Sequence, residues 1–420
     1  MTTLDRTQAP PFQLSSDYSL AHPEIFQLPN GINLYAFRGL QQDVVKLELI
    51  FNAGKWHEPF LGVSHFTAKM LTKGSHTKNS LQIAEALDSL GAHLEISPGY
   101  DVVTLSLFSL RKHVLGAVRI LAEILESPAF EERELRQLKE IFIQGLKVNN
   151  KKTSVVASKK IRSVIFGNEH PYGSSVEEQD VVKLSPKDLT TFYQSQFSLQ
   201  SAFLIGRLSE GDLKVVINMI PVTLSKPKED KTFEQIQGMS QTVTRPDSIQ
   251  ASIRLGKRCL LKGDRSEYFD AVMFTHILGG FFGSRLMKNI REEKGLTYGI
   301  HSSMNHFLHD SFWSISAEVN QQNASQAIIE IKNEINALQQ DLVPADELEI
   351  AQNYFIGSWQ SENSTVFSIA EKIKSLQLWG LPMEYYSHLM EHIKHITPAQ
   401  IQIAARTHFG TNDLLEIQVG

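Results

Sequence analysis

The stretch "GVSHFTAKMLTKGS", residues 62–75, predicts a helix that carries a histidine and a lysine on one face. Its apolar residues recur at helical spacing over residues 61–73, and Gly74 follows as a stop signal. His65 and Lys69 are four positions apart, so their side chains lie one above the other. Because two histidines at this spacing can bind one zinc ion, the stretch raises the question of a metal site.

The chemistry of these side chains does not favour zinc. Lys69 is protonated near neutral pH, and an ammonium group has no lone pair to give a metal. The residues between it and His65 are Phe66, Thr67 and Ala68, none of which takes a proton from water. Taken alone, a single histidine on a helix is usually structural, so these residues predict no zinc site.

The composition is that of a soluble globular protein. The chain has 420 residues, of which 42% are hydrophobic and 21% charged, and this length predicts two or three domains. The net charge of −5 gives no reason to expect a nucleic-acid partner, and the lysine-rich run at 149–160 is then a solvated surface. The single cysteine, Cys259, excludes an intramolecular disulfide. Neither a signal peptide nor a membrane span is recognisable, so we expect a cytoplasmic protein.

Strand and helix signals alternate along the first half of the chain. A hairpin is predicted at residues 24–37, where Asn30-Gly31 supplies the turn, and a second strand pair at 93–110 surrounds Pro98-Gly99. A strand is also predicted that ends at Gly54. Further helices are predicted at about residues 80–90, 112–126 and 131–148.

The second half repeats this order at a fixed spacing of 212 residues. That offset pairs Leu184-Ser185-Pro186 with Ile396-Thr397-Pro398, Lys160-Ile161 with Lys372-Ile373, and Phe197 with Phe409. Residues 301–319 then correspond to the strand pair at 93–110. Several matches at one spacing indicate a duplication. We therefore predict two homologous α+β domains, residues 1–222 and 242–420, joined by a polar linker at 223–241.

The segment around His65 resembles the inverted zinc motif, His-x-x-Glu-His, of the insulinase, pitrilysin and mitochondrial-processing-peptidase family. His65 matches the first histidine, and the surrounding frame is retained. Ala68 stands where the family has its catalytic glutamate, and Lys69 where it has its second zinc histidine. The third ligand, a glutamate, would fall near Gln144 or Gly145, and no acid lies between Ile141 and Gly167. The resemblance therefore implies a degenerate zinc motif and no metal in this chain.

The same resemblance continues beyond the zinc motif. "HPYG" at 170–173 matches a family segment, and "ILGGFFGSRLMKNIREEKGLTYGIHSS" at 277–303 follows the family pattern through Arg291 and Tyr298. In two-chain relatives, this arginine–tyrosine pair holds substrate in the chamber of a zinc-bearing subunit. A guanidinium and a phenol are suitable donors to a developing oxyanion. Without the family, Arg291 would pair with Glu292 or Glu293, and Tyr298 would belong to a strand core.

The resemblance implies a fold of two homologous domains, each a mostly antiparallel sheet with helices on one face, together forming half of a clamshell. It implies a non-catalytic subunit of a zinc-dependent peptidase, inactive alone, with zinc in a partner. The partner would be a zinc-bearing homologue, or a second copy in a homodimer, and the substrate a peptide or unfolded protein bound in extended form along a sheet edge. The alternatives are a peptide-binding or scaffolding pseudo-enzyme, and a peptidase with an unrecognised metal arrangement around His65.

Overall fold

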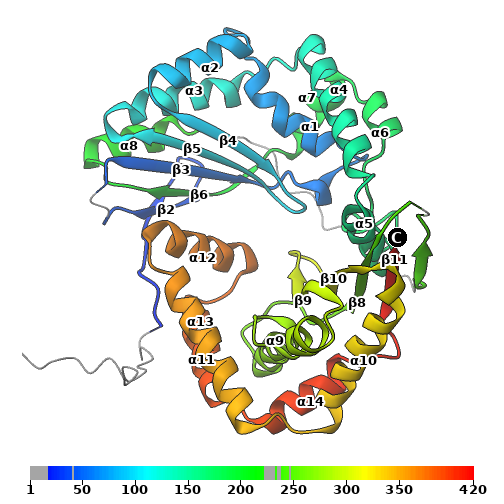
Figure 1. Cartoon of the computed structure of the whole chain (residues 1–420). Coiled ribbons are helices and arrows are strands. Elements are labelled where there is room, and N and C mark those ends of the chain that lie inside the picture. The colour runs from blue at the N-terminus through cyan, green and yellow to red at the C-terminus, as the bar shows by residue number, and fades with distance from the viewer. Residues whose placement is uncertain (1–17, 40–41, 222–231, 234–237, 246) are drawn as a thin grey trace, which may run out of the picture.

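A computed structural model describes residues 18–39, 42–221, 232–233, 238–245 and 247–420 (Figure 1). Within these residues, one sheet has six strands in the order β1-β2-β6-β3-β5-β4 and the other has five in the order β7-β11-β8-β10-β9. Every neighbouring pair is antiparallel except β2–β6 and β7–β11. The predicted α+β class with two mostly antiparallel sheets is therefore confirmed.

The elements follow the predicted order closely. The first half contains β1 (Glu24–Gln27), β2 (Asn33–Phe37), β3 (Val44–Phe51), α1 (Val63–Met70), α2 (Ser80–Ser89), β4 (His93–Pro98), β5 (Val103–Leu110), α3 (Val114–Glu126), α4 (Glu132–Asn149), α5 (Thr153–Phe166), α6 (Glu178–Lys183), α7 (Pro186–Gln196), β6 (Leu199–Ile205) and α8 (Glu210–Met219). The second half contains β7 (Gln241–Val243), β8 (Gln250–Arg258), α9 (Ser266–Gly279), a π-helical turn η4 (Met287–Glu293), β9 (Thr297–His306), β10 (Ser311–Asn320), α10 (Ala324–Gln340), α11 (Ala345–Glu362), α12 (Val366–Trp379), α13 (Tyr385–His395), α14 (Pro398–His408) and β11 (Leu415–Val419). The predicted linker at 223–241 lies largely outside the described residues, so the domain boundaries stay a prediction.

The repeat seen in the sequence is a repeat of local structure. Ser185 and Thr397 each cap a helix that begins with proline, and in both helices the side chain of the third helical residue hydrogen-bonds back to the cap. The hairpins β4–β5 and β9–β10 occupy the same place in their sheets, with β4 and β9 as outer strands. The duplication thus produced two copies of one strand order.

One face of each sheet packs on the helices of its own half. In β3 the side chains of Leu47, Leu49 and Phe51 belong to a core shared with helices that lie above the sheet in Figure 1. In β8 the side chains of Ile253 and Leu255 enter the corresponding core of the second half. Because side chains alternate along a strand, Lys46, Glu48 and Ile50 are left on the opposite face of β3.

A helix from the other half covers this opposite face, which the sequence did not predict. Helix α12 packs against β6 of the first sheet, and α5 packs against β8 and β11 of the second (Figure 1). These helices contain Lys372-Ile373 and Lys160-Ile161, the pairs related by the 212-residue offset. The two halves have therefore exchanged equivalent helices.

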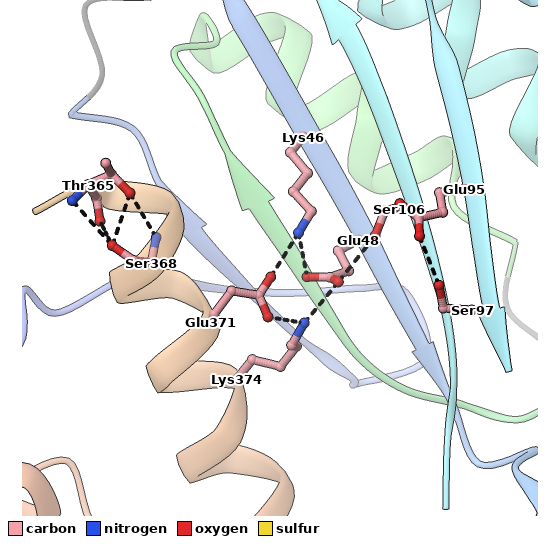
Figure 2. Close-up of polar contacts among 9 residues, drawn as sticks. All are labelled: Lys46, Glu48, Glu95, Ser97, Ser106, Thr365, Ser368, Glu371 and Lys374. Atoms are coloured by element: carbon pink, nitrogen blue, oxygen red, sulfur yellow. Dashed lines mark hydrogen bonds and ion pairs between the residues drawn. The ribbon is translucent and has the colours of Figure 1, made fainter. Parts of the chain in front are cut away.

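The contact of α12 with the first sheet contains a closed ring of alternating charges (Figure 2). Lys46 Nζ lies 2.9 Å from Glu371 Oε1 and 3.3 Å from Glu48 Oε2. Lys374 Nζ lies 3.0 Å from Glu48 Oε1 and also pairs with Glu371. Burial alone would raise the pKa of Glu371, but the hydrogen bonds from Lys374 and Lys46 outweigh it and lower that pKa. Two residues of the first half and two of the second therefore neutralise one another.

A second junction joins the halves near the tips of the two outer hairpins. Tyr172 of the "HPYG" segment is fully buried, stacks on Phe307 with ring centroids 4.0 Å apart, and donates its hydroxyl hydrogen to Asp101. The other carboxylate oxygen of Asp101 accepts from Leu308 N at 3.0 Å. Burial raises the pKa of Asp101, against the effect of these two hydrogen bonds. The "HPYG" segment thus holds the two halves together.

The charge ring gives a stability prediction. Glu48 is 3% exposed, so Glu48→Gln leaves two lysines beside a neutral amide where water cannot replace the lost charge. We expect the free energy of unfolding to fall by about 3 kcal/mol in urea denaturation followed by tryptophan fluorescence. Glu349→Gln, an isosteric change at an exposed position of α11, is the control. Equal stability of the two variants would show that the ring does not hold the halves together.

Candidate functional site

Helix α1 places the degenerate zinc motif in the helical layer of the first half. The backbone N–H of Ser64, at the start of the helix, donates to Glu58 Oε1 at 2.9 Å, and the Ser64 hydroxyl donates to the carbonyl of Ala53 at 2.5 Å. Phe66 and Met70 are fully buried, as their spacing predicts. This anchoring fixes the direction in which His65 and Lys69 leave the helix.

His65 lies among aromatic rings. Its ring centroid is 4.9 Å from that of Phe142 on α4 and 5.5 Å from that of Phe66. Burial, together with the charge of Lys69, lowers the pKa of His65 to about 4. The imidazole is therefore neutral at physiological pH and is packed as an apolar side chain.

The other motif positions give a metal no further ligands. Ala68 is fully buried, and Gln144 is exposed on α4, two residues beyond the Phe142 that faces His65. Lys69 Nζ donates to the carbonyl of Ile96 on β4 at 2.5 Å. Among the residues described, no three His, Cys, Asp or Glu side chains come together as a metal site. This donor set does not fit zinc.

The segment with Arg291 and Tyr298 connects a core helix to an outer strand. Helix α9 ends at Gly279, and Arg291 lies in the π-helical turn η4. Gly295 then takes a left-handed conformation, φ +62°, that leads the chain into β9. Single π-helical turns often occur at functional sites, where the extra residue redirects a side chain.

Arg291 is held without an acidic partner. Its guanidinium carbon lies 4.5 Å from the centroid of the Phe282 ring, and Phe282 is half exposed. Its Nη1 is buried and has no hydrogen-bond partner within the described part of the chain. No ion pair joins it to Glu292 or Glu293 there, so the structure does not bear out that alternative. A buried donor without an acceptor is costly, so the environment of Arg291 is not one that stability alone explains.

Tyr298 points into solvent. It is 94% exposed at the start of β9, so the alternative of a strand-core tyrosine is wrong. A tyrosine that buries almost nothing contributes little to the core. Its ring and hydroxyl are instead accessible beside the segment that holds Arg291.

The residues of the degenerate zinc motif and the arginine–tyrosine pair lie in different halves of the structure. His65 and Lys69 lie on α1 of the first half, whereas Arg291 lies on η4 and Tyr298 on β9 of the second half. The sequence analysis missed Phe142, Phe282 and the carbonyl of Ile96. Phe142 is two residues from the position expected for the third zinc ligand, and Phe282 lies within the glycine-rich "GGFFG" segment. Both residues are therefore close in sequence to features that the sequence analysis had already noted.

Two models of one family match successive parts of the chain. The one described as Insulinase (Peptidase family M16) matches residues 38–179, and the one described as Peptidase M16 inactive domain matches residues 183–355. The chain belongs to the M16 family. The M16 inactive-domain match includes Arg291 and Tyr298, and the family predicted from the sequence is confirmed.

Bacterial proteins are similar to this chain over most of its length. The chain is 23% identical over 366 residues to the Helicobacter pylori protein named "Non-peptidase homolog YmxG", which covers 84% of this chain and 83% of that one. It is 23% identical over 336 residues to the Bacillus subtilis protein named "Uncharacterized zinc protease YmxG", covering 78% and 81%. A Pseudomonas fluorescens structure described as a peptidase M16 inactive domain superposes with a TM-score of 0.85 at 21% identity. The match covers 95% of this chain and 98% of that one, which shows the shared fold.

In the described residues, no helix is long and apolar enough to cross a membrane.

The aromatic setting of His65 predicts its titration. We expect NMR to give a midpoint near pH 4, and a higher midpoint in Lys69→Met because the repelling charge is gone. Since the pKa in the folded state is below the ordinary value of 6.5, folding is favoured by neutral His65 above pH 6.5 and loses that contribution as pH falls toward 4. A midpoint near 6.5 would mean that the imidazole is solvated.

The donor set also predicts the metal content. After incubation with zinc and removal of excess metal, the purified chain should retain far less than one equivalent, measured by inductively coupled plasma mass spectrometry. His65→Ala should leave that small amount unchanged. One equivalent in the unmodified chain, lost in His65→Ala, would establish an unrecognised metal arrangement around His65.

Proposed function

We propose that this chain is the non-catalytic subunit of a zinc-dependent M16 metallopeptidase, and that it supplies Arg291 and Tyr298 to the substrate chamber of a zinc-bearing homologous subunit. In this role it takes part in peptide hydrolysis but is inactive alone, and it needs no cofactor of its own. The partner belongs to a hetero-oligomer, and the substrate is a peptide or an unfolded protein.

The state of Arg291 is the observation that carries the proposal. A permanent cation whose Nη1 has no hydrogen-bond partner among the described residues fits a substrate backbone carbonyl or carboxylate. The Phe282 ring lies beside the guanidinium group and restricts its motion, so less freedom is lost when a ligand binds. Tyr298, almost fully exposed nearby in sequence, adds a hydroxyl donor. The disabled motif at Ala68 and Lys69 leaves the attack on the peptide bond to another chain.

The second candidate is a peptide-binding or scaffolding pseudo-enzyme with no role in catalysis. The degenerate motif favours it as much as it favours the first. The two differ in what Arg291 and Tyr298 do when a zinc-bearing M16 chain is present. Only the shared site requires that these side chains affect the rate of hydrolysis.

Mixing experiments distinguish the two candidates. This chain is mixed with a purified M16 chain that has an intact His-x-x-Glu-His motif, and hydrolysis of a quenched fluorescent peptide is measured. We expect activity from the mixture and from neither chain alone. Arg291→Ala should lower kcat/KM by about a hundredfold, as for a lost oxyanion donor, and Tyr298→Phe by about tenfold.

Two controls complete the measurement. Arg265→Ala removes a half-exposed guanidinium elsewhere in the second half and should leave activity unchanged. Size-exclusion chromatography should show that Arg291→Ala still binds the partner chain. If hydrolysis by the mixture is insensitive to both Arg291→Ala and Tyr298→Phe, the shared-site proposal is wrong and the scaffolding function is favoured.

A further inference from the structure

The first sheet ends in two outer strands, β1 and β4, and β4 is the one beside the degenerate zinc helix. Gly99 N donates to Val102 O at 2.9 Å, so the N–H of Gly99 is directed toward β5. In an antiparallel pair the direction of the backbone groups alternates, and the β4–β5 register is unbroken from His93 to Pro98. The N–H and C=O groups of Leu94 and Ile96, and the C=O of Pro98, therefore point outward, away from the sheet.

Two of these outward positions are less able to pair with an added strand. The carbonyl of Ile96 already accepts a hydrogen bond from Lys69 Nζ at 2.5 Å. Pro98 has no N–H to donate. Of the outward positions, only Leu94 keeps both of its groups, and one such position does not make a ladder. Proline and lysine at an outer strand are known ways in which proteins prevent strand addition.

The outer strand of the second half lacks both features. β9 runs "TYGIHSSMNH" from Thr297 to His306, without proline or lysine. The blocking is therefore specific to the strand beside the degenerate zinc helix. It involves Lys69, the residue at the position of a zinc histidine.

We propose that Lys69 and Pro98 close the β4 edge to strand addition, so that an extended peptide held by Arg291 and Tyr298 pairs with an outer strand of the zinc-bearing partner. The inference rests on the proposed function, because it specifies which subunit provides the sheet for the substrate. Lys69 thereby has two effects: it removes a zinc ligand, and it occupies the acceptor that a substrate would need. The β4 edge of this chain alone then provides no strand-pairing site for peptides.

Peptide binding by the isolated full chain tests the proposal. The probe is a fluorescein-labelled, unstructured peptide of about ten residues that alternates apolar and polar residues. Binding is followed by fluorescence anisotropy, and hydrogen exchange of residues 93–98 is followed by mass spectrometry with and without the peptide. The wild-type chain should show no peptide-dependent protection of these residues.

Matched variants isolate the ammonium group. Lys69→Met keeps the apolar stem and frees the Ile96 carbonyl, so it should bind the peptide roughly tenfold more tightly and protect the Leu94 and Ile96 amides. Lys69→Arg retains a donor, and Lys73→Met removes a lysine that lies on the next turn; both should behave as wild type. Adding Leu94→Pro to Lys69→Met removes the outward N–H of Leu94, which an added strand would also need, and should abolish the gain.

Either of two results would overturn the proposal. The first is peptide-dependent protection of residues 93–98 in the wild-type chain, which needs no variant and is independent of any folding defect. The second is a Lys69→Met chain with an unchanged melting temperature and no gain in affinity. Both are measured on this chain alone, so they are separate from a failure of the mixing experiment.

Discussion

The carboxylate of Glu48 lies between two ammonium groups, one from its own strand and one from a helix that arrives more than 300 residues later in the chain. Lys374 brings α12 onto the first sheet, and Glu371 closes the ring with Lys46. A buried carboxylate is stable only while both cations remain in contact with it, so this interaction fixes the position of α12. Through α12, it also fixes the second half relative to the first.

The opposite junction is of a different kind. At Tyr172 and Phe307, stacked rings and the carboxylate of Asp101 hold the tips of two hairpins together. One junction is therefore electrostatic and the other aromatic. Together they fix the second half, which carries Arg291 and Tyr298, against the first half.

Local signals in the sequence predicted the elements up to about residue 148, and the family resemblance implied the two-sheet fold. Turn residues such as Asn30-Gly31 act within a few positions, so they can be recognised without the rest of the structure. The helix exchange could not be predicted in this way. The apolar stripe of α12 indicates that one face is buried, but it does not indicate which sheet buries it.

The candidate site was predictable to a similar extent. Resemblance indicated Arg291 and Tyr298, and simple ligand chemistry indicated that Lys69 cannot replace a histidine. The partners of these side chains depend on contacts between distant segments, and no pattern gives them. Phe142 beside His65, Phe282 beneath Arg291 and the Ile96 carbonyl at Lys69 are all of this kind.

The exchanged helices also bear on how such a molecule arises and assembles. Two separate copies of the half-chain would have to find one another in solution before either could cover its sheet. In one continuous chain, each helix searches for the other sheet at the high effective concentration that a tether provides. The duplication thus turned an encounter between molecules into a step of folding, and it left each half free to lose or keep its own set of functional side chains.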